Sequence, residues 1–254
     1  FAPSASGPLH IGHALTASSS FLFVKKYGGK LYVRIEDTNP ENIYPPAYEM
    51  IKKESDWLFD GIAKVVVQSD GMKLYYKYAE KLIKINFAYV CTCSQEEFKK
   101  YAEKQDDCKC RKQNVKENLE RWKKMLDKKG FKEGGAVLRF KSGMQDQNPA
   151  MRDFPLARIN LTKHVRHGSK YRVWPLMNFA VTVDDIETKM THVIRGKDHR
   201  DNAERQRRIY MALGLKSLIP WTAFLGRIKF TDMELSTTKI RKEIEAKKYS
   251  GWDD

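Results

Sequence analysis

Apolar and polar positions in the first third of the chain alternate between a helical and a strand-like period. The spacing predicts a helix over 11–27, a β-strand over 30–35 and a second helix over 47–59, after an opening turn rich in glycine and proline. Strands that alternate with helices are typical of βαβ units, in which the strands pair in parallel. We therefore expect residues 1–88 to fold around a parallel sheet.

The pattern changes after residue 88. Lysine-rich segments at 95–104 and 115–129 have a helical period, and short strands are expected at 137–140 and 156–161. These lysine-rich helices and short strands indicate a second domain of the α+β type that is inserted into the first one.

The alternation of strands and helices resumes after residue 173. Helices are expected over 179–185, over 202–213 and from 239 onward, and strands over 191–195 and around 223–225. The expected division is therefore 1–88 and 174–254 for the split α/β domain and 89–173 for the insertion.

Apolar runs in this chain are short. The longest, such as 61–67, are strand-sized, whereas a helix that crosses a bilayer requires ~18 consecutive apolar residues. Apolar residues form 41% of the 254 residues, which is enough for a packed core, so we expect a soluble protein without a membrane role. The chain opens on Phe1 with no initiator Met and no leader-like segment, which predicts a piece of a longer protein.

The balance of charge is strongly basic. The 47 Lys and Arg residues exceed the 32 Asp and Glu residues, for a net charge of +15. Such a surface attracts polyanions, although a solvated lysine-rich face has the same composition. Many of these cations fall in the insertion and are interleaved with Tyr101 and Trp122: Lys99, Lys100, Lys104, Lys109, Arg111, Lys112, Lys116, Arg121, Lys123, Lys124, Lys128 and Lys129.

The most informative short segment leads into the first predicted helix. His10 and His13 lie three positions apart at the start of that helix, and Gly12 between them leaves room for a ligand against the backbone. Free backbone N–H groups and the positive end of the helix dipole favour phosphate at this place. Two histidines at this spacing also occur as an ordinary surface or core pair.

All four cysteines lie in one stretch of the insertion, as the pairs Cys91-x-Cys93 and Cys108-x-Cys110. Four thiolates in two close pairs can form a tetrahedral Zn²⁺ site of the structural kind. Disulfides and unrelated free thiols are the alternatives, and the clustering favours neither of them.

Four segments carry a resemblance to class I aminoacyl-tRNA synthetases. Residues 6–13, Ser-Gly-Pro-Leu-His-Ile-Gly-His, resemble their HIGH signature, and 34–40, Arg-Ile-Glu-Asp-Thr-Asn-Pro, resembles a segment of the glutamyl and glutaminyl members. Residues 193–199, Val-Ile-Arg-Gly-Lys-Asp-His, are similar to a segment that completes the amino-acid pocket. Residues 235–239, Leu-Ser-Thr-Thr-Lys, are similar to the divergent KMSKS loop of archaeal and eukaryotic-type glutamyl enzymes.

The resemblance implies a Rossmann-like catalytic domain and a two-step reaction. Glutamate would attack the α-phosphorus of ATP, and the glutamyl-adenylate would then react with the terminal adenosine of tRNA(Glu). His10, His13 and Lys239 would stabilise the phosphates, with Mg²⁺ carried by ATP. Further binding residues are implied for ATP at Gly12, Asp198 and Ser236 and for glutamate at Ser4, Glu36 and Arg195.

Glu36 follows a predicted strand, where open α/β sheets bind ligands, and its carboxylate could take the ammonium group of the amino acid. Arg195 favours glutamate over glutamine, because a guanidinium pairs bidentately with a carboxylate and a neutral amide leaves it undersatisfied.

The family resemblance also implies that the insertion guides the acceptor end of tRNA and carries zinc, in a cytoplasmic enzyme. Whether tRNA(Gln) is a second substrate stays open. Two other readings also stay open: a short paralogue that glutamylates a modified tRNA nucleoside, and an inactive tRNA-binding module of synthetase origin.

Overall fold

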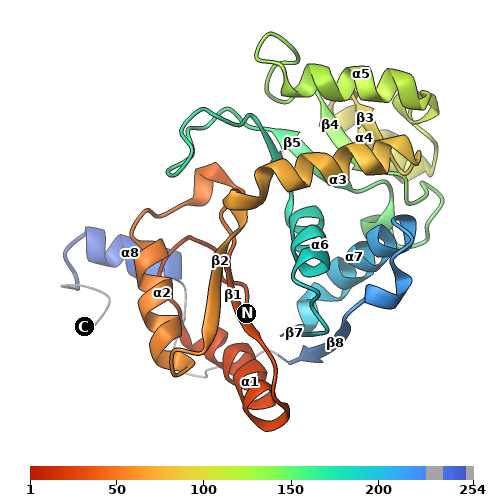
Figure 1. Cartoon of the computed structure of the whole chain (residues 1–254). Helices are drawn as coiled ribbons and strands as arrows, with labels where there is room; N and C mark the ends of the chain where they lie inside the picture. The colour runs from red at the N-terminus through yellow and green to blue at the C-terminus, as the bar shows by residue number, and fades with distance from the viewer. Residues whose placement is uncertain (227–236, 250–254) are drawn as a thin grey trace.

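The first part of the chain is built on parallel strands, as its pattern predicts. The computed structural model in Figure 1 describes residues 1–226 and 237–249. Its first helices and strands are α1 (Ile11–Tyr27), β1 (Leu31–Ile35), α2 (Ala47–Leu58) and β2 (Ala63–Val67). Strands β1 and β2 pair in parallel, and residues 1–5 run alongside β1, with the Glu36 N–H donating to the Pro3 carbonyl at 2.9 Å.

A second parallel pair comes from the last part of the chain. Its helices and strands are α6 (Met177–Glu187), β7 (His192–Gly196), α7 (Arg200–Ala212), β8 (Trp221–Leu225) and α8 (Thr237–Glu245). Strands β7 and β8 pair in parallel and are separate from the β1–β2 pair. Helix α1 contacts β7 and so links the two pairs. The α/β prediction is confirmed, and each predicted helix or strand here lies within two residues of an observed one.

The middle of the chain forms an antiparallel sheet flanked by helices. Its parts are β3 (Ala88–Cys91), α4 (Gln95–Lys104), α5 (Val115–Leu126), β4 (Val137–Phe140), β5 (Pro155–Ile159) and β6 (Val173–Pro175). The sheet order is β3-β4-β5-β6, and Figure 1 shows this unit at the end of the molecule opposite α1. Short 3₁₀ helices lie between these α-helices and strands, at Pro40–Asn42, Gln68–Gly71, Lys109–Lys112, Pro149–Met151, Lys197–His199 and Lys216–Leu218.

Helix α3 (Met72–Lys84) was not predicted, and it joins the two parts of the fold. Its apolar residues Met72, Tyr75, Ala79 and Leu82 recur at helical spacing and are fully buried. They belong to one hydrophobic core that also takes in the antiparallel sheet, α5, α6 and α7. The expected boundaries at 88 and 173 fall on the outer strands of that sheet, and the independence of the inserted unit stays a prediction. Within residues 1–226 and 237–249, no helix is long and apolar enough to cross a membrane.

Candidate active site

A cavity of about 600 Å³ opens between the two parallel strand pairs. Its lining comes from segments far apart in the sequence, including Ser4, His13 at the start of α1, Glu36 after β1 and Arg195 on β7. Arg158 of β5 also lines it, so the inserted unit reaches the cavity. Four of the residues proposed for phosphate or glutamate binding are thus brought to one place.

The two histidines at the start of α1 are arranged as a reciprocal helix cap. The Gly12 N–H donates to His10 Nδ1 at 3.1 Å, and the His10 N–H donates to His13 Nδ1 at 3.3 Å. Because each Nδ1 accepts a hydrogen bond, each neutral ring carries its proton on Nε2. The rings stack with centroids 3.8 Å apart, and a Cβ at Gly12 would lie 2.9 Å from His10 Cε1, so the stack requires glycine there.

The fold disfavours a positive charge on either histidine. Partial desolvation lowers the pKa of His10, whose side chain is exposed, and burial together with the adjacent His10 lowers the pKa of half-buried His13 to about 4. The pair therefore offers two Nε2–H donors without a positive charge. Donors of this kind can bind phosphate oxygens by hydrogen bonding, and the positive field comes from the helix N-terminus.

A buried cluster of charged side chains around Arg34 forms part of the cavity lining. Arg34 Nη1 lies 2.6 Å from Asp185 Oδ1, its Nη2 lies 3.4 Å from Glu36 Oε1, and its Nε lies 3.6 Å from Asp184 Oδ2. Burial alone would lower the pKa of Arg34, but Asp185, Glu36 and Asp184 together raise it. Burial raises the pKa of Glu36, against the pull of Arg34, and raises that of Asp184 to about 6.

Arg195 is the second cation of the cavity, and its environment differs from that of Arg34. Its Nη1 donates to the neutral amide oxygen of Gln206 at 3.0 Å. Among residues 1–226 and 237–249, no carboxylate lies within ion-pair distance of its guanidinium. Burial lowers the pKa of Arg195, yet an arginine remains charged. A half-buried guanidinium that faces a cavity and pairs with a neutral group is suited to an anionic ligand.

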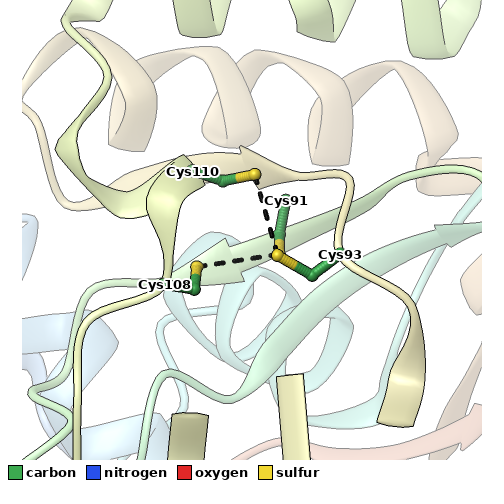
Figure 2. Close-up of side chains that lie close together, drawn as sticks. All are labelled: Cys91, Cys93, Cys108 and Cys110. Carbon is green, nitrogen blue, oxygen red and sulfur yellow. Dashed lines mark hydrogen bonds between the residues drawn. The ribbon is translucent and has the colours of Figure 1, made fainter. Parts of the chain in front are cut away.

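The four cysteines of the inserted unit converge, as Figure 2 shows. Their sulfur atoms all lie within 4.8 Å of one another, with Cys91 Sγ 3.9 Å from Cys108 Sγ and Cys93 Sγ 4.0 Å from Cys110 Sγ. Four sulfurs about 2.3 Å from one tetrahedral Zn²⁺ would be about 3.8 Å apart, so the cluster fits a zinc ion with little movement.

The surroundings of Cys110 stabilise a thiolate. Hydrogen bonds from Cys108 and Cys91, and then from Thr92, lower the pKa of its thiol. The Arg121 guanidinium lies 3.9 Å from the same sulfur. Burial has the opposite effect on Cys93 and raises the pKa of its thiol to about 11. Hydrogen bonds with Cys108 and Cys110, and then burial, likewise raise the pKa of the Cys91 thiol, so a thiolate is favoured at Cys110 and disfavoured at Cys91 and Cys93.

The basic residues of the inserted unit divide into an outer and an inner group. Ten lysines of α4, α5 and their connections are exposed and suited to phosphate contacts. The two arginines point inward, since Arg111 pairs with Asp153 at 2.7 Å and Arg121 approaches Cys110. Trp122 is buried in the core, so it is not available for stacking on a base.

The sequence matches a family of known proteins over its whole length. A family model described as "tRNA synthetases class I (E and Q), catalytic domain" matches residues 1–254. The chain belongs to this family. The glutamate–tRNA ligase of Methanocaldococcus jannaschii is 50% identical over 254 residues, which cover 100% of this chain and 45% of that protein. The glutamate–tRNA ligase of Methanothermobacter marburgensis is 46% identical over the same length, also 45% of that protein.

The chain thus spans about half the length of the curated relatives it matches. Among solved structures, a glutamate tRNA ligase from Elizabethkingia meningosepticum in complex with its amino acid has a TM-score of 0.67 and 24% identity. The match covers 95% of this chain and 52% of that one, and it supports the fold. The recognition of a class I synthetase catalytic domain from its motifs is therefore confirmed.

The other residues proposed from the motifs for phosphate or ATP binding that the structure describes are not among the cavity lining: His10, Gly12, Asp198 and Lys239. Gly12 is in the first turn of α1 and Asp198 follows β7, where a Cβ at Gly196 would meet Asp198 Oδ1 at 2.5 Å. Lys239 is exposed on α8 and is not among the cavity residues, whereas Ser236 falls outside the described residues. The catalytic role of Lys239 and the ATP-binding roles of Gly12, Asp198 and Ser236 stay predictions.

Sequence reasoning missed the residues that organise the charges of the cavity. Arg34, Asp184 and Asp185 form the buried cluster, and Gln206 holds Arg195. One signal was present, because Arg34 interrupts an otherwise apolar strand, Leu-Tyr-Val-Arg-Ile, and a charge in such a strand requires a buried partner.

Proposed function

We propose that the full-length protein ligates L-glutamate to tRNA(Glu) at the expense of ATP, first forming glutamyl-adenylate and then transferring the glutamyl group to the terminal adenosine of the tRNA. Membership of the family and the names of the archaeal relatives support this proposal. The choice of amino acid rests on one observation, the Arg195 guanidinium in the cavity with a neutral partner.

The charges of the cavity suit two ionic groups of glutamate, its side-chain carboxylate and its ammonium group. Arg195 would pair with the side-chain carboxylate, and its distance from the buried carboxylates leaves that role open to it. Glu36 lies just after β1 and also lines the cavity, and it would accept hydrogen bonds from the ammonium group. A glutamine side chain has no charge to offset the buried guanidinium, so it would bind more weakly.

Adenylate formation requires little proton transfer, because the attacking group is already an ionised carboxylate. The enzyme contributes by aligning the two substrates and by stabilising charge on the phosphates. The neutral Nε2–H groups of His10 and His13 would serve as donors to the phosphate oxygens at the N-terminus of α1. The ammonium group of Lys239 would lie beside the β- and γ-phosphates and stabilise their negative charge, and Mg²⁺ would bind together with ATP.

The cysteine cluster would hold one structural Zn²⁺ through Cys91, Cys93, Cys108 and Cys110. A site with four protein ligands leaves no open position, so its task would be to fix the connections between β3, α4 and α5. The exposed lysines on these helices would contact the tRNA backbone near its acceptor end. A cytoplasmic location is part of the same prediction, and whether tRNA(Gln) is a second substrate stays open.

The test is glutamate-dependent exchange of pyrophosphate into ATP by the full-length protein, in the presence of tRNA. The expected result is exchange with glutamate that exceeds exchange with glutamine. Exchange with glutamine alone would overturn the assignment of Arg195, and the absence of exchange with both would favour an inactive tRNA-binding module. Glutamylation of a modified nucleoside without charging of the terminal adenosine would favour the short-paralogue reading.

A further inference from the structure

The segment between β5 and β6 lies against the turn that follows Glu36. His164 in this segment is 2% exposed, and its Nε2 lies 3.0 Å from the carbonyl oxygen of Asp37 and 3.5 Å from the carboxylate Oδ2 of the same residue. The backbone N–H of Arg166 donates to His164 Nδ1 at 3.1 Å. Because Nδ1 accepts this bond, the neutral ring carries its proton on Nε2 and donates it to Asp37. The ring also stacks on Trp174, with centroids 4.8 Å apart.

Asp37 is itself held from several sides. Its carboxylate accepts the Tyr48 hydroxyl at 2.8 Å, the Ser69 N–H at 2.8 Å and the Ser69 hydroxyl at 2.7 Å. Burial would raise the pKa of Asp37, but its hydrogen bonds with His164, Ser69 and Tyr48 outweigh burial and lower it. The Asp37 carboxylate is therefore held in place by several hydrogen bonds, and the hydrogen bond from His164 to the Asp37 carbonyl oxygen holds the backbone of the residue as well.

A second contact from the inserted unit fixes the same turn. Arg158 Nη2 donates to Asn39 Oδ1 at 3.0 Å and to Glu41 Oε2 at 3.1 Å. Arg158 and Asn39 both line the cavity. The inserted unit thus holds the residues after Glu36 at two points, from β5 and from the segment that follows it.

The turn needs such support because Glu36 lies beyond the end of β1. On one side its peptide groups pair with residues 1–5, through the Pro3 carbonyl at 2.9 Å and the Ala5 N–H at 3.1 Å. On the other side β2 pairs with β1 only as far as Ile35, opposite Val67, and His164 holds the peptide between Asp37 and Thr38. A rotation of that peptide would change ψ of Asp37, and the shift of Asp37 that follows would move the neighbouring Glu36 carboxylate relative to the substrate.

We propose that His164 is a positioning residue for amino-acid binding, which acts on Glu36 through the carbonyl oxygen of Asp37. This inference rests on the proposed function, since it concerns the site assigned to the ammonium group of glutamate. It gives the inserted unit a part in amino-acid recognition, in addition to its proposed contact with tRNA.

Two variants isolate the hydrogen bond from the rest of the side chain. His164→Gln keeps an N–H donor near the place of Nε2, whereas His164→Asn reaches only as far as Nδ1. Both lose the ring that stacks on Trp174. Only His164→Gln keeps the donor to Asp37, whereas only His164→Asn can keep the acceptor for the Arg166 N–H, so a higher KM in His164→Asn than in His164→Gln reports the bond to Asp37. In the full-length protein, His164→Asn is expected to raise the KM for glutamate about tenfold, with the KM for ATP and kcat within about twofold. His164→Gln is expected to stay within about threefold of the wild type.

Leu138→Val is the matched control, because Leu138 is fully buried in the same unit and does not line the cavity. It should lower the melting temperature while leaving the KM for glutamate unchanged. The inference is overturned if His164→Asn and His164→Gln have the same KM for glutamate, or if the KM values for glutamate and ATP rise together. A wild-type protein without glutamate-dependent exchange would instead contradict the proposed function.

Discussion

Arg195→Ala tests the assignment of the glutamate carboxylate most directly. The only described hydrogen-bond acceptor of its guanidinium is the Gln206 amide oxygen at 3.0 Å, so its charge is available to a ligand. A charge-assisted hydrogen bond contributes about 1.5–3 kcal/mol, and a bidentate pair that strengthens the complex by about 3 kcal/mol corresponds to roughly 10²-fold in affinity. We therefore expect kcat/KM for glutamate to fall roughly 10²-fold, mostly through KM.

The stability of the protein should change far less than its activity. Removal of one hydrogen bond to a neutral amide costs about 1 kcal/mol, because no described carboxylate is left unpaired. The assay is pyrophosphate exchange by the full-length protein at saturating ATP and tRNA, with urea unfolding of the same samples. Arg195→Lys keeps the charge without the bidentate geometry and should lie between alanine and the wild type. An unchanged KM for glutamate in Arg195→Ala would refute the assignment.

Three further predictions concern the metal, the histidine pair and the buried charges. Cys108→Ser should lower the zinc content, by elemental analysis, from about one ion per chain to near zero; a metal-free wild type would contradict the site. The pKa of His13 is lowered from 6.5 to about 4, so between these pH values the unfolded state binds a proton that the folded state does not. The unfolding free energy of the wild type minus that of His13→Gln, measured by urea unfolding, should therefore rise with pH from about 4 to 6.5 and then level off. Asp185→Asn breaks the buried pair with Arg34 and should cost about 3–5 kcal/mol of unfolding free energy, whereas Asp60→Asn, in the exposed pair with Lys25, should cost at most about 1 kcal/mol; equal losses would count against the buried cluster.

The inserted unit has a larger role in the proposed site than its sequence indicated. Its texture predicted a separate domain, yet its sheet shares one core with α3, α6 and α7. It also supplies Arg158 to the cavity and His164 to the turn after Glu36. A ligand that displaced this unit would therefore be expected to alter the amino-acid site.

Local patterns in the sequence determined the helices and the motifs. Helices α1, α4 and α5 begin at residues that cap them, His10, Ser94 and Asn114, and each cap depends on residues three positions away. The cysteine pairs and the HIGH-like segment are equally local, which is why the proposed zinc site and the family could be recognised. Helix α3 lacks a side-chain cap at Gly71, and the sequence pattern did not predict this helix.

Only the tertiary structure decided which charges meet. Arg34 and Asp185 are 151 positions apart, and His164 and Asp37 are 127 positions apart, so no local spacing relates them. Their pairing depends on how β1, α6 and the inserted unit pack, since burial makes an unpaired charge or carbonyl costly and selects the partner that is within reach. The motifs of the sequence alone determined the family of this chain, and packing decided that Arg34 pairs with carboxylates while Arg195 has the neutral Gln206 as its described partner.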